Sequence, residues 1–285
     1  MSAARLEVVA RQICDHRQLA FRGLLGQGAF KETYLVEGTD GELLALKILL
    51  PGHNPERTAR EIEAMLRCSH PNVARLRLVD SLGVDGVEHV YMLEEYLSGG
   101  TLGTLLERGL LSRPQVIHLA RRLVDALGHI AELGLVHRDL KPENIMFRGG
   151  IEAPVVVDFG IVRDLTSRSL TQTWFMRGPG TPYFAAPEQL NNEKELIDWR
   201  TDQFSLGIVL AICICGRHPY EDVVGNSART VEQVATRIGP TEQFRAAIAE
   251  VGFTLLERMV SPWPVQRFRR PEQLIQAWEE TGENP

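Results

Sequence analysis

Cysteine and aromatic residues are scarce in this chain of 285 residues, which has four cysteines and only 7% Phe, Trp and Tyr. Four cysteines do not make a disulfide framework in a chain this long. Cys213 and Cys215 form a C-x-C pair, but no second pair of Cys or His follows at zinc-binding spacing. We therefore expect buried thiols in a reducing compartment, and we predict a cytoplasmic protein.

Long apolar runs are also lacking. The longest run, 204–215, is too short to cross about 30 Å of hydrocarbon. The charged residues Arg5, Glu7 and Arg11 interrupt the region where a signal peptide needs its apolar core. The sequence thus predicts no membrane segment in this chain, and a membrane anchor beyond Pro285 in a longer parent chain stays open.

The chain has no excess of positive charge, because 31 Lys and Arg face 37 Asp and Glu for a net charge of −6. This balance gives no electrostatic footprint for binding nucleic acid. The hydrophobic share of 44% and the charged share of 24% are ordinary for a globular protein. Repeats and low-complexity tracts are missing as well, so the length suggests one or two folded domains with a substantial core.

Residues 2–18 are predicted to form one amphipathic helix. Leu6, Val9, Ala10 and Ile13 recur at helical spacing. We interpret residues 1–18 as a helical extension that packs on its own domain. An arm that binds a partner is the alternative.

The segment 19–97 is rich in predicted strands. Asp40-Gly41 and Asp85-Gly86 are strong hairpin signals. Pro55 marks the start of the one helix expected in this half. The expected strands are 19–25, 34–37, 43–50, 76–82 and 88–94, and the expected helix is 56–67.

From Ser98 onward the pattern changes to helices. A half rich in strands followed by a half rich in helices predicts an α+β protein with two lobes, 19–97 and 98–285. The expected helices are 114–133, 204–215, 231–238, 244–259 and 271–279.

One lysine lies inside a continuous apolar strand. Lys47 occupies the middle of 43–50, and removing an ammonium group from water is costly unless an anion pairs with it. This placement favours a functional anion-binding lysine. The alternative is a lysine at a sheet edge whose charged end reaches water.

Two further segments concentrate ionisable groups. The loop 137–144 has five of them, together with Asn144, between apolar flanks, and this density suggests a catalytic site. The segment Val155-Val156-Val157-Asp158-Phe159-Gly160 ends a buried strand with a carboxylate beside a glycine. A carboxylate at such a strand end is well placed to hold a metal ion.

The order of these segments along the chain is typical of a known protein family. Gly26-Gln27-Gly28, Lys47, Glu61, the loop 137–144, Asp158-Phe159-Gly160 and Ala186-Pro187-Glu188 together form the protein-kinase signature set. The chain resembles the eukaryotic-like (Hanks-type) Ser/Thr protein kinases, most similarly those of bacteria, and Lys141 is typical of the Ser/Thr branch. The resemblance implies a single kinase domain, 19–279. Its bilobal fold would have a small antiparallel β-sheet lobe with one main helix, followed by a larger, mostly helical lobe.

The resemblance also implies roles for particular residues. Asp139 would accept the proton of the substrate hydroxyl, and Lys141 would screen the γ-phosphate. Lys47 would neutralise the α- and β-phosphates of ATP, with Glu61 holding it in place. Asn144 and Asp158 would hold Mg²⁺, or Mn²⁺ as an alternative. The implied ATP-binding residues are Gly26, Gln27, Gly28, Lys31, Thr33, Ala45, Lys47, Glu95, Leu97 and Met146.

Further positions are implied to serve structure and regulation. Asp202 would anchor the backbone of the catalytic loop, and Glu188 and Arg267 would form a buried ion pair. Arg138 would dock a phosphorylated activation segment, because pairing between arginine and phosphate can order a loop. Within that segment, the resemblance favours Thr171 and Thr173 as phosphorylation sites.

The sequence departs from the family pattern at three positions. Lys31 replaces the third glycine of the phosphate loop, and Thr33 replaces the valine that usually covers adenine. Glu94 occupies the position behind the adenine pocket, where an apolar, Thr or Gln side chain is commoner. Its orientation stays open, since a shift of one residue in strand register would turn it outward.

The predicted function is transfer of the γ-phosphoryl group of Mg-ATP to Ser and Thr hydroxyls of a protein substrate, including the kinase itself. The main alternative is a catalytically weak pseudokinase that serves as a scaffold. A kinase-fold enzyme acting on small molecules is a third reading. The complete set of Lys47, Glu61, Asp139, Asn144 and Asp158 argues against the second reading, and Lys141, Glu188 and Arg267 argue against the third.

Overall fold

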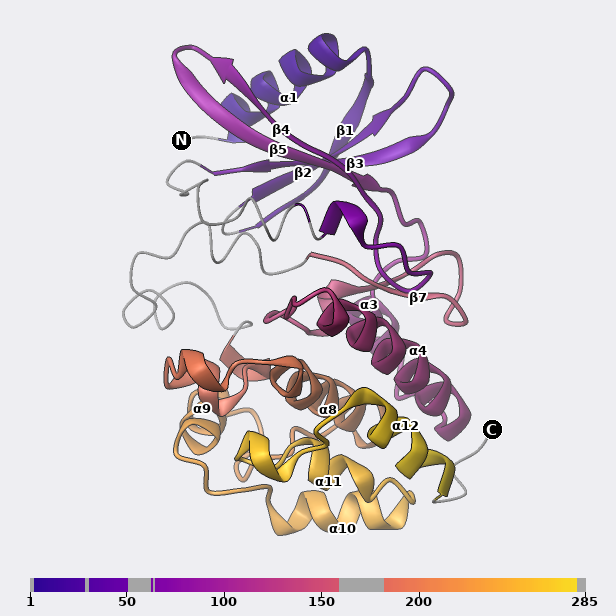
Figure 1. Ribbon diagram of the computed structural model, residues 1–285, viewed down its shortest axis with the longest axis vertical. Helices are drawn as coiled ribbons and strands as arrows, with labels where there is room; N and C mark the ends of the chain where they lie inside the picture. The colour runs from indigo at the N-terminus through magenta and orange to yellow at the C-terminus, as the bar shows by residue number, and fades with distance from the viewer. Residues whose placement is uncertain (1–2, 29–30, 51–62, 64, 159–181, 281–285) are drawn as a thin grey trace. The chain divides into compact units, whose positions relative to one another are not determined.

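The computed structural model describes residues 3–28, 31–50, 63, 65–158 and 182–280. They divide into two compact units. The first contains the described residues up to 70 together with 74–97, and the second contains 71–73 and the described residues from 98 onward. Strands dominate the first unit and helices dominate the second (Figure 1).

The first unit is built on a five-stranded antiparallel sheet. Its strands are ordered β1-β2-β3-β5-β4. The tight turn at Asp85 and Gly86, both with positive φ, joins β4 to β5 as the Asp-Gly signal predicts. The bounds are β1 (Ala20–Gln27), β2 (Lys31–Glu37), β3 (Leu43–Leu49), β4 (Leu76–Val84) and β5 (Val87–Glu95).

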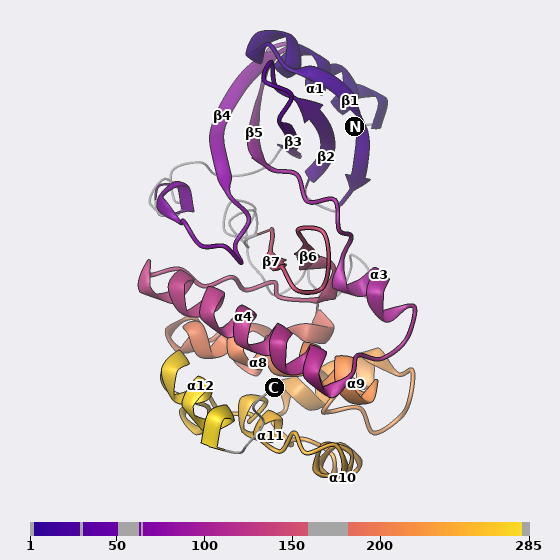
Figure 2. The same ribbon diagram turned by 90° about the vertical axis from the view of Figure 1, so that its right-hand side faces the viewer.

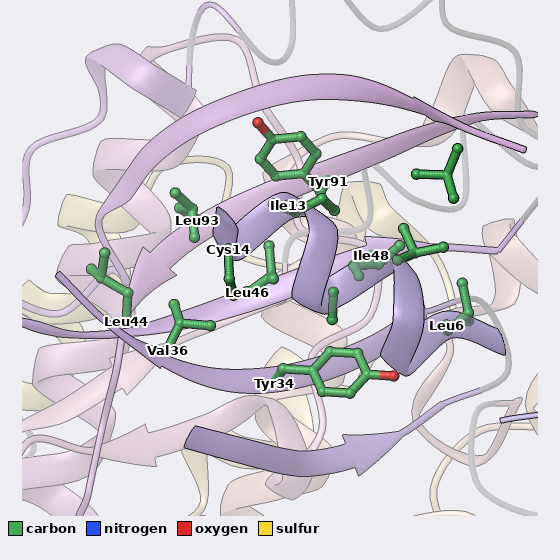
Figure 3. Packing of buried hydrophobic residues seen from close by; sticks show 13 residues of the cluster. Leu6, Ile13, Cys14, Tyr34, Val36, Leu44, Leu46, Ile48, Tyr91 and Leu93 are labelled. Atoms are coloured by element: carbon green, nitrogen blue, oxygen red, sulfur yellow. The ribbon is translucent and has the colours of Figure 1, made fainter. Parts of the chain in front are cut away.

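Helix α1 (Ala3–Arg17) lies across one face of this sheet (Figures 1 and 3). Its apolar side chains and those of the sheet form one buried cluster. At the end of the helix, Arg17 donates a 2.6 Å hydrogen bond to the Tyr91 hydroxyl and also pairs with Asp80. The expectation that the helix packs on its own domain is thus confirmed. The cluster comprises Leu6, Val9, Ala10, Ile13, Cys14, Tyr34, Val36, Leu44, Leu46, Ile48, Val84, Tyr91 and Leu93.

The predicted strands all occur, with longer bounds in several cases. β2 begins at Lys31 rather than at residue 34, because Lys31 to Thr33 already pair with β3. Of the helix predicted over 56–67, residues 65–67 are helical and most of the remainder lies outside the described residues.

The second unit is organised around α8 (Trp199–Cys215), which is buried on nearly every side. Helix α4 (Arg113–Glu132) packs along it, and α12 (Pro271–Glu280) packs on α4 (Figure 2). Gly207 permits the close approach of α11 to α8, since a Cβ there would lie 2.7 Å from Val260 Cγ1. The other helices are α3 (Leu102–Leu106), α7 (Pro187–Leu190), α9 (Ser227–Ala235), α10 (Glu242–Glu250) and α11 (Leu255–Met259).

Three predicted helices needed correction. α8 begins at Trp199 rather than at 204, because the Asp198 side chain accepts from Arg200 N–H and caps the helix. The helix predicted over 231–238 is wrong at both ends. The side chain of Asn226 caps α9, which then ends at Ala235, just before Arg237 takes a positive φ. The single helix predicted over 244–259 is two helices, α10 and α11, separated at Gly252, whose φ of 71° ends the first.

A small two-stranded sheet and short 3₁₀ turns complete the second unit. Strand β6 (Ile145–Phe147) pairs antiparallel with β7 (Pro154–Val156). Within the described ranges, none of the helices has the combination of length and apolar character that a membrane crossing needs. The 3₁₀ turns are η2 (Pro142–Asn144), η3 (Pro182–Phe184), η4 (Lys194–Leu196) and η5 (Pro264–Gln266).

The packing of α1 predicts that the helix contributes to the stability of the sheet. Ile13 is fully buried, and Ile13→Ala should lower the free energy of unfolding by about 2–5 kcal/mol through lost burial and a cavity. Val8, on the same helix, is 50% exposed, so Val8→Ala serves as the matched control. Chemical denaturation followed by circular dichroism measures both. Equal effects of the two variants would contradict the packing described for α1.

Candidate active site

The backbone of the loop 137–144 is held by one buried carboxylate. Asp202, in the first turn of α8, accepts hydrogen bonds from the N–H groups of His137 at 2.7 Å and Arg138 at 2.8 Å. Arg138 has φ of 63°, a strained value for a residue with a side chain. Burial raises the pKa of the Asp202 carboxyl, although both neighbours counteract this through charge and through their N–H groups. The two hydrogen bonds thus fix a turn that the chain would not adopt on its own.

His137 ties the same loop to the strand end that carries Asp158. Its Nδ1 accepts a hydrogen bond from Asp139 N–H at 3.2 Å. The ring is therefore protonated at Nε2, which donates to Val157 O at 2.9 Å. Because the ring is fully buried, these two hydrogen bonds fix the backbone at Asp139 relative to the backbone at Val157, which precedes Asp158.

The Asp139 carboxylate is contacted by two side chains that the sequence singled out. Lys141 Nζ lies 3.3 Å from Asp139 Oδ2. Asn144 Nδ2 donates to the same oxygen at 3.1 Å and to the backbone oxygen of Asp139 at 2.8 Å. An ammonium group and an amide therefore converge on one carboxylate, whose side chain is 18% exposed. This arrangement suits proton acceptance from a hydroxyl beside a negatively charged group.

The orientation of Asn144 bears on metal binding. Its amide nitrogen faces Asp139, so its amide oxygen, the atom that hard cations prefer, points to the other side. Asp158 follows β7 and has φ of 60°, which turns the chain at the end of that strand. Among the described residues, no three His, Cys, Asp or Glu side chains form a metal-holding group. The donor set of one amide and one carboxylate oxygen fits Mg²⁺ with further ligands from phosphate and water.

A fully buried ion pair supports the segment that follows residue 181. Arg267 donates to both carboxylate oxygens of Glu188, at 2.7 and 3.1 Å, and Thr201 donates to Glu188 at 2.9 Å. Neither charged side chain is exposed. Gln189, next to Glu188, donates to the backbone oxygen of Arg138 at 2.9 Å. The segment after 181 is thereby linked to the loop 137–144 within the second unit.

In the first unit, Lys47 forms a buried ion pair with Glu94. The side chains of both residues are only 7% exposed. Glu94 lies opposite Ala45 in the pairing of β3 with β5, so Ala45, Lys47 and Glu94 share one face of the sheet. α1 covers the opposite face (Figure 3). Of the two orientations left open for Glu94, the structure therefore has the one toward Lys47.

The other predicted nucleotide-binding residues lie in both units. Thr33 is paired with Lys47 across β2 and β3, and Gly26 is paired with Thr33 across β1 and β2. Gly28 N–H donates to Lys31 O at 2.8 Å, which closes the turn between these strands. The Gln27 side chain donates a hydrogen bond to Glu32. Glu95 is the last residue of β5, and Leu97, two residues later, is buried. Met146 belongs to β6 of the second unit. Glu61, Thr171 and Thr173 lie outside the described residues.

The backbone of η3, directly after residue 181, is held by a histidine that the sequence analysis did not single out. His218 Nδ1 accepts from Tyr220 N–H at 3.1 Å, so its Nε2–H donates to Tyr183 O at 2.9 Å. The rings of His218 and Tyr183 are 4.4 Å apart. Burial lowers the pKa of His218 to about 3, although the hydrogen bond to Tyr183 counteracts this.

Comparison with known proteins identifies the class of protein that this fold and site define. A model of the protein kinase domain matches residues 19–278. Myosin light chain kinase A of Dictyostelium discoideum is 31% identical over 210 residues, covering 70% of this chain and 67% of the relative. Human calcium/calmodulin-dependent protein kinase type 1B is 34% identical over 215 residues, covering 70% and 57%. The probable serine/threonine-protein kinase PknB of Bifidobacterium longum is 31% identical over 229 residues, covering 75% and 32%.

The fold agrees with this. The crystal structure of Rad53 1-466 in complex with AMP-PNP matches with a TM-score of 0.70 at 21% identity, covering 93% of this chain and 66% of that one. The chain belongs to the protein kinase family and is a kinase domain of the serine/threonine class. The α+β fold with an antiparallel sheet lobe and a helical lobe is confirmed. The chain spans between about a third and two thirds of the length of these curated relatives.

Two contacts at the site escaped sequence reasoning for different reasons. The Lys47–Glu94 pair was left undecided, although Met92 and Glu94 alternate with Tyr91 and Leu93 along β5 and thereby indicate one common face. The contact of His218 with Tyr183 joins residues 35 positions apart. No local pattern around His218 marks it as a ligand of that carbonyl group.

The Glu188–Arg267 pair predicts a large stability effect. Arg267→Met would leave the Glu188 carboxylate buried without its cation and should lower the free energy of unfolding by about 3–5 kcal/mol. Arg229, whose pair with Asp222 is largely exposed, provides the control, and Arg229→Met should leave the denaturation midpoint nearly unchanged. Urea denaturation measures both variants, and similar midpoints for the two would contradict the assignment.

Burial of His218 predicts a contribution to acid sensitivity. The unfolded chain binds a proton on this ring near pH 6.5, whereas the folded protein resists protonation down to about pH 3. Acidification between these values therefore lowers the free energy of unfolding, by up to about 1.4 kcal/mol per pH unit. His218→Gln removes this contribution, so its unfolding free energy should fall less steeply with acidification. Denaturation curves from pH 7 to 4.5 test this, and a slope equal to that of the wild type would refute it.

Proposed function

We propose that this chain transfers the γ-phosphoryl group of Mg-ATP to Ser and Thr hydroxyls of proteins. The observation that carries the proposal is the convergence of Lys141 and Asn144 on the Asp139 carboxylate. Phosphoryl transfer depends mainly on positioning and on electrostatic stabilisation of the moving group. A carboxylate held beside a cation, in a loop whose backbone is anchored by Asp202, meets both needs.

In this proposal each group of the loop has one task. Asp139 accepts the proton of the attacking hydroxyl, because its carboxylate is held by two neighbours and still partly exposed. Lys141, 20% exposed and 3.3 Å from Asp139, neutralises charge on the γ-phosphate. The two side chains thus act on the two reactants that must meet.

The residues present also fit a divalent cation. Asn144 and Asp158 would hold Mg²⁺, with Mn²⁺ as an alternative, through the amide and carboxylate oxygens. When bound, the ion neutralises charge on the β- and γ-phosphates. Asn144 has a second task, since its amide nitrogen orients the Asp139 carboxylate.

Several residues of the first unit are proposed to bind the nucleotide. Gly26 and Gly28 allow the backbone to come close to the phosphates, and Lys47 neutralises them. Lys31 adds a positive charge where the family pattern has glycine. The adenine ring would contact Thr33, Ala45, Glu95 and Leu97, together with Met146.

Proteins are the proposed substrates, and the chain itself is one of them. Thr171 and Thr173 are the proposed phosphorylation sites, with Arg138 as their docking residue. A cytoplasmic location is proposed on the four free thiols, Cys14, Cys68, Cys213 and Cys215, which suit a reducing compartment.

The role of Asp139 is tested by transfer of ³²P from γ-labelled ATP in the presence of Mg²⁺. The substrates are the protein itself and a generic basic protein. We expect transfer by the wild type and a loss of at least about 100-fold in Asp139→Asn, because general base catalysis contributes on this scale. Phosphopeptide mapping of the autophosphorylated protein then locates the modified threonines.

A matched control is Asp125→Asn, at an exposed position of α4, which should keep the activity of the wild type. Equal transfer by the wild type and Asp139→Asn would contradict the role of Asp139. No transfer by a folded wild type, also after prior phosphorylation of its activation segment, would favour the pseudokinase reading instead.

A further inference from the structure

Lys47 and Glu94 come from neighbouring strands of one sheet. In the pairing of β3 with β5, Lys47 is opposite Met92 and Glu94 is opposite Ala45. The two charged residues are therefore diagonal neighbours on the same face, a separation that long side chains span. Ala45, directly opposite Glu94, carries only a methyl group, which leaves the Glu94 carboxylate space to lean toward Lys47. The ammonium group and a carboxylate oxygen of Glu94 are in direct contact.

The burial of this pair distinguishes it from an exposed ion pair of the same sheet, Arg22 with Glu37. Both side chains are 7% exposed, whereas those of Arg22 and Glu37 on the same sheet are 50% and 28% exposed. Attraction between opposite charges increases as water is excluded. The buried pair therefore holds its two side chains in place far more strongly than the exposed pair does. The position of the Lys47 ammonium group is accordingly coupled to β5.

We propose that Glu94 is a positioning residue for Lys47, which it fixes from within the sheet for contact with the nucleotide phosphates. This inference rests on the proposed role of Lys47 in phosphate binding. It assigns to β5 a task that the family resemblance gives to Glu61. Since β3 and β5 are joined by backbone hydrogen bonds, the contact with Glu94 places the Lys47 ammonium group from within the sheet.

The test compares the affinity of three proteins for two ligands, ADP with Mg²⁺ and adenosine. The proteins are the wild type, Lys47→Met and Glu94→Gln, and titration calorimetry supplies the dissociation constants. A misplaced Lys47 affects only the ligand that has phosphates. We therefore expect Glu94→Gln to weaken ADP binding roughly tenfold, in the range of couplings between contacting residues, and to leave adenosine binding unchanged.

Two further proteins sharpen the comparison. Glu88→Gln is the control. Glu88 is an exposed carboxylate on the same strand, and it accepts a hydrogen bond from Ser81. The Glu88→Gln protein should bind both ligands as the wild type does. The double variant Lys47→Met/Glu94→Gln should bind ADP no more weakly than Lys47→Met, since Glu94 acts through Lys47. Thermal unfolding confirms that each variant is folded. Should Glu94→Gln fail to fold, Glu94→Asp replaces it, with a smaller but equally ADP-selective loss expected.

Each remaining outcome identifies what fails. Unchanged ADP binding in Lys47→Met would overturn the proposed phosphate contact of Lys47. A loss in Lys47→Met without a loss in Glu94→Gln would overturn only the positioning role of Glu94. The positioning role of Glu94 would also be overturned if Glu94→Gln tightens ADP binding, or if it weakens the binding of ADP and adenosine equally.

Discussion

The backbone of the loop 137–144 depends on the buried carboxylate of Asp202. Removing this group from water is unfavourable, and burial raises its pKa accordingly. Its two short hydrogen bonds to backbone N–H groups offset part of that cost and hold Arg138 at a positive φ. The strained turn sets the direction in which Asp139 leaves the backbone. The geometry of the loop therefore depends on a residue of α8 that lies outside the loop.

Buried anions serve a similar purpose elsewhere in the molecule. In the second unit, Glu188 fixes the segment after residue 181 through Arg267, and in the first unit Glu94 is paired with Lys47. In each case, an ion pair that stabilises the fold only modestly, once desolvation is counted, gives one side chain a defined position. A kinase site needs side chains in fixed positions, since phosphoryl transfer depends mainly on the positioning of the reacting groups.

The loop 137–144 could be singled out from the sequence, because a dense group of ionisable residues has few structural explanations, and the structure brings Lys141 and Asn144 onto the Asp139 carboxylate. The ion pair of Glu188 and Arg267 followed from the family resemblance alone. The orientation of Glu94 stayed open in the sequence, because a shift of one residue in strand register would turn it outward. In the structure, Glu94 lies opposite Ala45 in the uninterrupted pairing of β3 with β5. The break between α10 and α11 was missed because apolar residues continue at helical spacing on both sides of Gly252.

The central proposal is that Lys47, paired with Glu94, contacts the nucleotide phosphates, and that Asn144, which also orients Asp139, holds the metal ion together with Asp158. A crystal structure of the protein with Mg²⁺ and a non-hydrolysable ATP analogue tests it most directly. The account predicts the Lys47 ammonium group within hydrogen-bond reach of the α- or β-phosphate and still in contact with Glu94, and the metal ion on Asn144 and Asp158. A nucleotide whose phosphates have no contact with Lys47, or a metal ion bound away from Asn144 and Asp158, would contradict it.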